Sequence, residues 1–144
     1  MIDTAQSSSQ IGLTAFRADA RFAGIDGSGY SIVIIDTGIN KTHPYLAGHI
    51  AYSYDFSGAN DADATDFNGH GSNVSSIAAG STGVASGAGI IHLKVFADNS
   101  GTAFYTDVEE ALQWVAANAA AYNIASVNLS LGAGVNYSLS LIHI

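Results

Sequence analysis

A run of four β-branched apolar residues that ends at a carboxylate constrains this chain more than any other feature. Residues 32–35 read Ile-Val-Ile-Ile, and Asp36, Thr37 and Gly38 follow directly. An uninterrupted apolar run of this kind is typical of a strand buried on both faces, as in a parallel sheet covered by helices. In open α/β sheets, ligands and reactive groups gather at the carboxyl ends of the strands. Asp36 is therefore the first candidate for a functional residue.

The segments that follow alternate between strand and helix patterns. The apolar residues of 68–80 fall at helical spacing, and Gly80 can end that helix. Thr106 and Glu109 form a capping box that predicts the start of a second helix. Strands are expected over residues 49–56, 90–96 and 125–131. This alternation predicts parallel pairing through right-handed crossovers, so the fold class is α/β with a mainly parallel sheet flanked by helices.

The chain of 144 residues is long enough for one domain. Residues 1–10 are polar and rich in serine, which predicts a flexible lead-in, and residues 11–22 are expected to form a short surface helix. Residues 11–138 are expected to form the α/β unit. Residues 139–144 resemble the translation of a transposase adapter end used in sequencing libraries, so we expect this tail not to be native.

Composition and charge exclude several classes of partner. Twelve acidic residues against four basic ones give a net charge of −8, which repels phosphate backbones and anionic membranes. Nucleic-acid binding is therefore excluded. The sequence shows neither a signal peptide nor an apolar run of about 20 residues that could span a membrane. The absence of cysteine excludes disulfides and thiolate metal sites.

A histidine at the start of the first expected helix is the second candidate for chemistry. His70 is flanked by Gly69 and Gly71, which leave room around the imidazole. A parallel sheet can bring this histidine and Asp36 to one edge. A carboxylate that accepts a hydrogen bond from one imidazole nitrogen fixes the tautomer and leaves the other nitrogen as a general base. The pair would be two thirds of a nucleophilic triad, whereas the other histidines are interpreted as structural or surface residues.

Three ordered motifs carry a family resemblance. Residues 36–39 read Asp-Thr-Gly-Ile, residues 68–74 read Asn-Gly-His-Gly-Ser-Asn-Val, and residues 127–132 read Val-Asn-Leu-Ser-Leu-Gly. Together they resemble the signatures in the first half of subtilisin-like serine peptidases. Ser72 and Asn73 depart from the threonine and second histidine that the family usually has. The resemblance implies a three-layer subtilisin-like fold, with this chain as the N-terminal part of the catalytic domain, truncated before the nucleophilic serine.

The resemblance also implies roles for individual residues. Asp36 would orient and stabilise the imidazolium, and His70 would transfer the proton between a serine hydroxyl and the leaving amine. An extended polypeptide substrate would pair with two backbone segments. These segments are Ser130, Leu131 and Gly132, and Ser100 with Gly101. The resemblance further implies secretion, a monomer when the protein is complete, and no required cofactor.

Calcium is a further expectation, as a structural ion. The loop at residues 57–67 is rich in carboxylates, which a flexible loop can offer to Ca²⁺, although solvated turn carboxylates are the alternative. Some members of the family bind calcium in the loop before the catalytic histidine. By that resemblance, Asp55, Asp61 and Asp63 are the candidate ligands.

The remaining parts of the family's catalytic machinery are not found in this sequence. The oxyanion-hole asparagine and the nucleophilic serine of the family lie well after the Ser-Leu-Gly motif, and twelve residues follow Gly132 here. We therefore expect the chain to come from a serine endopeptidase of this family and to be inactive on its own. The alternative is a catalytically dead subtilisin-like module that binds extended peptides. A nucleotide-binding domain is disfavoured, because the glycine-rich residues 24–29 precede their strand rather than follow it.

Overall fold

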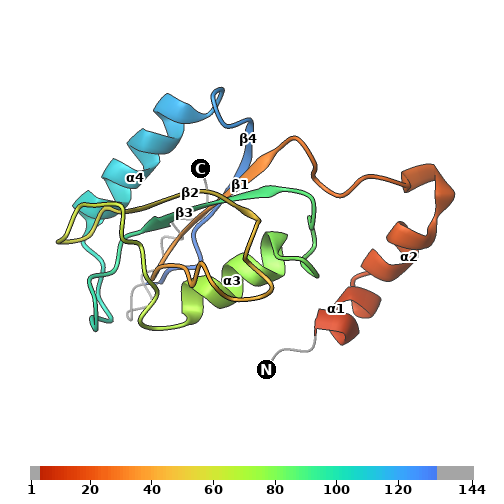
Figure 1. The fold of residues 1–144 in the computed structure, drawn as a ribbon, viewed down its shortest axis with the longest axis horizontal. Coiled ribbons are helices and arrows are strands. Elements are labelled where there is room, and N and C mark those ends of the chain that lie inside the picture. Colours follow the sequence, from red (N-terminus) through yellow and green to blue (C-terminus); the bar gives the residue numbers. More distant parts are fainter. Residues whose placement is uncertain (1–3, 133–144) are drawn as a thin grey trace, which may run out of the picture.

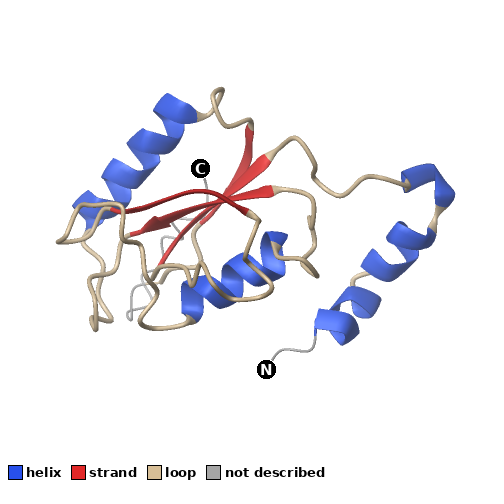
Figure 2. Ribbon diagram, in the orientation of Figure 1, coloured by secondary structure: helices blue, strands red, loops and turns tan. Residues whose placement is uncertain are grey.

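The computed structural model describes residues 4–132, which form a parallel four-stranded sheet in the order β2-β3-β1-β4. One helix lies on each face of the sheet (Figure 1). These elements are β1 (Ser31–Asp36), β2 (Ile50–Asp55), α3 (His70–Ala79), β3 (Gly89–Lys94), α4 (Tyr105–Asn118) and β4 (Ile124–Asn128). The layers, coloured by secondary structure in Figure 2, confirm the predicted α/β class. The tail expected to be non-native, at residues 139–144, lies outside the described residues.

The two central strands, β1 and β3, place alternate side chains on opposite faces of the sheet. In their register Ile34 lies beside His92 and Asp36 beside Lys94. Val33 and Ile35 of β1 and Ile91 and Leu93 of β3 pack in the core under α4, and Ile90 packs in the core under α3. The core on the α4 side comprises Val33, Ile35, Ile91, Leu93, Val95, Ala111 and Val115. The smaller core on the α3 side comprises Ile39, Leu46, Ala79, Ala88 and Ile90.

Aromatic rings complete the α4 side. The Trp114 ring stacks on that of Tyr52, with 4.6 Å between centroids, and Tyr122 packs against both. Trp114 is thus a packing residue of the layer between α4 and the sheet. This aromatic layer extends the apolar core from the central strands to the edge strand β2.

Helix α3 approaches the sheet very closely. It begins at His70 and ends at Ala79 with Gly80 as its C-cap, as predicted. Gly71 is buried, and a Cβ added to it would overlap the carbonyl oxygen of Gly38 and lie 2.8 Å from Cε1 of His92. Only a residue without a side chain lets the helix approach the carboxyl end of β1 this closely, so the glycine after His70 has a packing role.

One expectation about a helix start is wrong. The capping box at Thr106 does not form, because α4 begins at Tyr105 and places Thr106 inside the first turn. There its hydroxyl donates to Asp107 at 3.1 Å. Residues 4–10, within the segment predicted to be a flexible lead-in, form a helix, α1 (Thr4–Gln10).

The helix expected over residues 11–22 is divided in two. It consists of α2 (Leu13–Ala18) and a 3₁₀ turn η1 (Ala20–Phe22). Asp19 separates them, since its side chain accepts the backbone N–H of Arg21 and caps the turn. We call α1, α2 and η1 the N-terminal arm, which extends away from the sheet (Figure 1). Arg17 connects the arm to the sheet domain by donating to the carbonyls of Gly83 and Val84.

Candidate active site

Asp36 and His70 meet at the carboxyl end of β1. Oδ1 of Asp36 lies 2.8 Å from Nδ1 of His70 and accepts the backbone N–H of Thr37 at 2.7 Å. The aspartate side chain is completely buried, whereas 48% of the histidine side chain is exposed. Oδ2 of Asp36 has no hydrogen-bond partner among the described residues. A buried carboxylate thus holds one side of an imidazole whose ring remains open to solvent.

Asp66, which the sequence interpretation passed over, connects the segments that carry this pair. Its Oδ1 accepts from the Thr37 hydroxyl at 3.0 Å and from two backbone N–H groups just before α3. Its Oδ2 accepts from the Ser72 hydroxyl at 2.6 Å and from the Ser72 N–H at 2.9 Å. Partial burial alone would raise the pKa of Asp66, but these hydrogen bonds, first of all from Ser72, lower it below its ordinary value. The ionised carboxylate therefore caps α3 and orients its first turn.

Thr37 extends this network to the backbone of the helix. Its hydroxyl donates to Asp66 and accepts the N–H of Gly71 at 2.9 Å. The residue after Asp36 is therefore bonded to the residue after His70. Asp66 lies four positions before the helix start, outside the N-cap and first-turn positions where acidic residues mark a helix, so no local pattern singled it out. Its bond to Thr37, 29 positions away, had no sequence signal.

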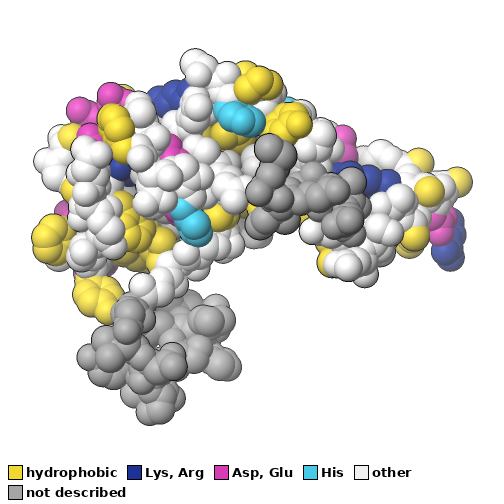
Figure 3. Space-filling view, turned by 90° about the horizontal axis from the view of Figure 1, so that it is seen from below, with side chains coloured by type: hydrophobic (Ala, Val, Ile, Leu, Met, Phe, Trp, Pro, Cys, Tyr) yellow, Lys and Arg dark blue, Asp and Glu magenta, His cyan; other side chains and the backbone are white. Residues whose placement is uncertain are grey.

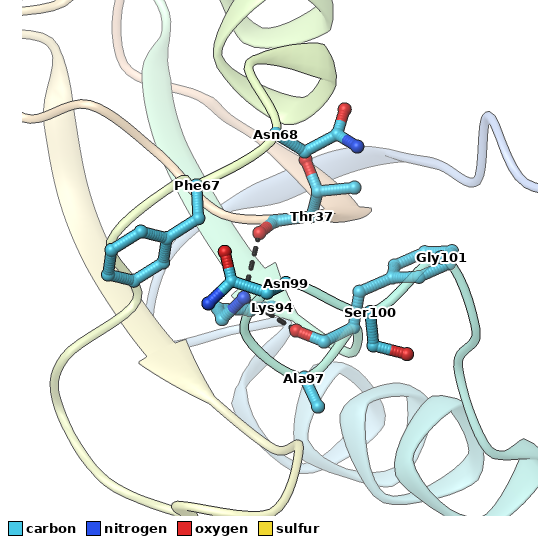
Figure 4. Close-up of a pocket in the computed structure, with 9 residues that line it drawn as sticks. Thr37, Phe67, Asn68, Lys94, Ala97, Asn99, Ser100 and Gly101 are labelled. Atoms are coloured by element: carbon cyan, nitrogen blue, oxygen red, sulfur yellow. Dashed lines mark hydrogen bonds between the residues drawn. The ribbon is translucent and has the colours of Figure 1, made fainter.

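Lys94 supports the same edge of the sheet from β3. Its side chain is buried, and its ammonium donates to the carbonyls of Thr37 at 3.0 Å and Phe96 at 2.5 Å. It also pairs with Asp98 at 3.2 Å. Figure 4 shows Lys94 between Thr37 and the loop after β3. The ammonium thus joins the ends of β1 and β3. The position of this lysine in the sequence, at the end of an apolar run, did not predict that role.

A small cavity of about 180 Å³ opens beside Lys94. Ser100 and Gly101, two of the predicted substrate-binding residues, line it opposite Thr37 (Figure 4). The other lining residues are Phe67, Asn68, Phe96, Ala97 and Asn99. The cavity therefore lies between the segment that leads into α3 and the loop that follows β3.

The predicted substrate-binding residues 130–132 follow the edge strand β4. Ser130 and Gly132 are exposed, whereas the side chain of Leu131 is partly buried and packs against the core on the α4 side. These residues do not line the cavity. The structure therefore leaves backbone accessible at two separate segments near the carboxyl edge of the sheet.

The three candidate calcium ligands do not converge. Asp55 is buried and accepts from the Ser57 N–H and hydroxyl, while the exposed Asp61 and Asp63 accept backbone N–H groups within their own loop. Within residues 4–132, no group of three or more His, Asp or Glu side chains is placed to hold a metal ion. In this arrangement the three carboxylates do not fit a calcium site.

The surface around the domain carries few charges. Uncharged side chains and backbone dominate the face seen in Figure 3, as 11% charged residues would suggest.

None of the helices within residues 4–132 has the length and apolar character that crossing a bilayer requires.

Comparisons with known proteins agree with this geometry. The subtilase family matches residues 27–140. The chain is 40% identical over 118 residues to alkaline serine exoprotease A of Vibrio alginolyticus, covering 81% of this chain and 21% of the relative. It is 35% identical over 139 residues to thermitase of Thermoactinomyces vulgaris, covering 92% of this chain and 48% of the relative.

A solved structure gives the same result. A cold-adapted subtilisin-like serine proteinase superposes with a TM-score of 0.66 at 38% identity, covering 79% of this chain and 41% of that protein. The chain thus spans between about a fifth and a half of the length of these proteins. Since the family match covers most of its length, the chain belongs to the subtilase family of serine proteases.

Proposed function

We propose that this chain supplies the aspartate and the histidine of an Asp-His-Ser triad in a serine endopeptidase. The hydrogen bond of 2.8 Å between Asp36 Oδ1 and His70 Nδ1 carries the proposal. Because the bond occupies Nδ1, the other ring nitrogen is the one available to a nucleophile. The buried carboxylate stabilises the positive charge that forms when the imidazole accepts a proton.

His70 acts as the general base and then as the general acid. It takes the proton from the hydroxyl of a serine as that oxygen attacks the peptide carbonyl, and it returns the proton to the leaving amine. Asp36 keeps the imidazole in the tautomer that this cycle needs. The exposure of half the histidine side chain supports this role, because the reacting ring must be accessible.

The serine and the oxyanion donor come from elsewhere in the complete protein. Ser138 and Ser140, the two serines after Gly132, stand too close in sequence to the proposed substrate-binding segment to serve as the nucleophile. We therefore infer that the 144-residue chain alone does not hydrolyse peptides. In a subtilisin, removal of one oxyanion donor alone costs about 2.7–4 kcal/mol of transition-state stabilisation.

The proposed substrate is an extended polypeptide. Ser130 to Gly132 on one side and Ser100 with Gly101 on the other would pair with its main chain as added strands, with side chains entering cavities such as the one beside Lys94. The exposure of Ser130, Gly101 and Gly132 supports this, because backbone pairing needs accessible N–H and C=O groups. We also propose that the complete protein is a secreted monomer that needs no cofactor.

Two measurements test the proposal. The first reads the source gene past the codon for Ile144, where we expect the frame to continue to a glycine-flanked serine. The second labels the full-length product with a fluorophosphonate probe, which reacts with an activated serine. Labelling of the unaltered protein and its loss in His70→Ala would support the triad.

Two other outcomes would contradict the proposed peptidase function. A gene that ends at Ile144, or a full-length protein whose serine is replaced, would leave a peptide-binding module without catalysis. Labelling that His70→Ala does not reduce would show that the serine is activated by another residue.

A further inference from the structure

The side chain of His92, in the middle of β3, has no part in the function proposed above, although it is completely buried. Its Nε2 accepts the backbone N–H of Gly38 at 3.1 Å. Its Nδ1 lies 3.0 Å from the hydroxyl of Ser75 on α3. A polar ring therefore stands between apolar residues of β3, with both nitrogens hydrogen-bonded.

These partners determine the state of the ring. A backbone N–H can only donate, so Nε2 carries no proton, and the proton on Nδ1 is donated to the Ser75 hydroxyl. Burial lowers the pKa of His92 to about 3; the negative charge of Asp66 opposes this shift, and the positive charge of Lys94 adds to it. The imidazole is therefore neutral at neutral pH and has a single tautomer.

The ring touches both segments that carry the reacting pair. Gly38 comes two residues after Asp36, and Ser75 comes five residues after His70 on the same helix. The Cε1 atom of the ring packs under the glycine that follows His70, where a Cβ would lie 2.8 Å away. The segment after Asp36, helix α3 and the His92 ring thus pack closely against one another.

We propose that His92 is a positioning residue that holds the segment after Asp36 against α3 and so keeps Asp36 and His70 at hydrogen-bonding distance. An apolar side chain of similar size would fill the space but would leave the Gly38 N–H without an acceptor. The segment would then shift to find another partner, and the carboxylate would shift with it. Only the catalytic consequence of this proposal rests on the proposed function.

Three variants separate positioning from general stability. His92→Leu removes both hydrogen bonds. His92→Gln is the conservative variant, since its carbonyl can accept from Gly38 and its amide can donate to Ser75. Ile91→Ala is the matched control, because this neighbouring residue of β3 packs on the α4 side. Its truncation lowers stability without removing a contact to the segment after Asp36.

The first readout is NMR on the 144-residue chain and does not depend on catalysis. It follows the exchange of the Gly38 amide and the low-field proton of the bond between His70 and Asp36. In His92→Leu we expect the low-field signal to disappear and Gly38 protection to fall by about tenfold or more. His92→Gln keeps both, and Ile91→Ala keeps both at a lower melting temperature.

Two results would overturn the proposal: His92→Leu that keeps both signals, or Ile91→Ala that loses them as readily as His92→Leu does. Should His92→Leu not fold, Ser75→Ala decides, because it removes only the acceptor of the Nδ1 proton. Weaker protection of the Gly38 amide in Ser75→Ala would support the proposal, and unchanged protection would overturn it.

The second readout is the kinetics of the full-length protein. His92→Leu should lower kcat about 100-fold with KM nearly unchanged, since a misplacement of about 1 Å costs on that order. His92→Gln should recover most of the loss. An unchanged kcat in His92→Leu would overturn the catalytic part. If the unaltered protein shows no peptidase activity, the proposed function fails, and the NMR readout still decides the role of His92.

Discussion

The two faces of the sheet are built from the same strands but differ in the polarity of the side chains that they bury. Under α4 the strands contribute valine, isoleucine and leucine, and aromatic rings extend the layer. Under α3 the same strands contribute Asp36, His92 and Lys94, each buried. Asp36 and Lys94 both bond to Thr37, which also bonds to Asp66. His92 bonds separately to Gly38 and Ser75.

The difference shows how one sheet can separate stability from chemistry. Burial of apolar area on the α4 side stabilises the fold without directional demands. Polar groups on the α3 side stay buried only because nearly all of them have partners, which also fixes their positions. We therefore expect substitutions on the α3 side to affect geometry and catalysis first, and those on the α4 side to affect stability first.

The largest effect tests the α3 side at its reacting pair. In the full-length protein, Asp36→Asn should lower kcat by about 10⁴-fold, because the amide leaves the imidazole in the wrong tautomer. Active-site titration and thermal melting would be measured together. Loss of activity that merely follows loss of folded protein would contradict the separation of the two faces.

On the α4 side, Leu93→Ala should lower the free energy of unfolding by about 2–5 kcal/mol, because Leu93 is completely buried in the apolar core. Urea unfolding can be followed through Trp114, the single tryptophan of the chain. Val127→Ala is the control, since 37% of that residue is exposed, and it should cost far less. The comparison fails if Leu93→Ala abolishes the hydrogen bond between Asp36 and His70 while the chain remains folded.

Gly71→Ala tests the close approach of α3. Alanine favours a helix over glycine by about 1 kcal/mol, but its Cβ would overlap the Gly38 carbonyl, and overpacking costs about 1–3 kcal/mol. We expect the clash to dominate and the variant to be less stable. Gly58→Ala is the control, since open space surrounds that position. Equal stability of Gly71→Ala and the unaltered chain would show that the helix can move away without cost.

The smallest effect concerns pH and Asp66. Its lowered pKa means that the folded chain binds this proton less readily than the unfolded chain. The contribution to stability is therefore complete above the ordinary carboxyl pKa of about 4 and is lost as pH falls through the lower folded value. Asp66→Asn turns a donor toward the Ser72 N–H and should cost about 1–2 kcal/mol at pH 7.

Urea unfolding of Asp66→Asn and the unaltered chain at several pH values would measure this. The difference between them should shrink below about pH 4. A difference that stays constant down to pH 2 would assign the effect of Asp66 to packing rather than to its charge.

The parts that the sequence predicted are those with local patterns. The run at residues 32–35 has the period and length of a buried strand, and the motif around His70 opens a helix that ends at Gly80. The start of α4 was misplaced because the capping-box pattern is short and can occur by chance; here it begins at Thr106, two residues after the observed N-cap, Phe104. Local chemistry at helix ends is therefore a weaker guide than apolar periodicity.

The parts that the sequence missed depend on contacts between distant residues. Asp66 bonds to a residue 29 positions away, and His92 bonds to one 54 positions away. A histidine within the apolar run of β3 was a signal that the strand faces a polar layer, but nothing in the run named Gly38 as its partner. Such partners become visible only once the strand order is known.

The alternation of β3 has a consequence for how the chain selects its strand pairing. A shift of β3 by one residue against β1 would turn His92 and Lys94 toward the apolar core under α4. There the ring and the ammonium would lose their hydrogen-bond partners, and an unpaired buried charge is far more costly than a lost apolar contact. A strand of uniform isoleucine and valine would have no such preference. The polar residues that equip one face for chemistry therefore also specify the register in which the two central strands pair.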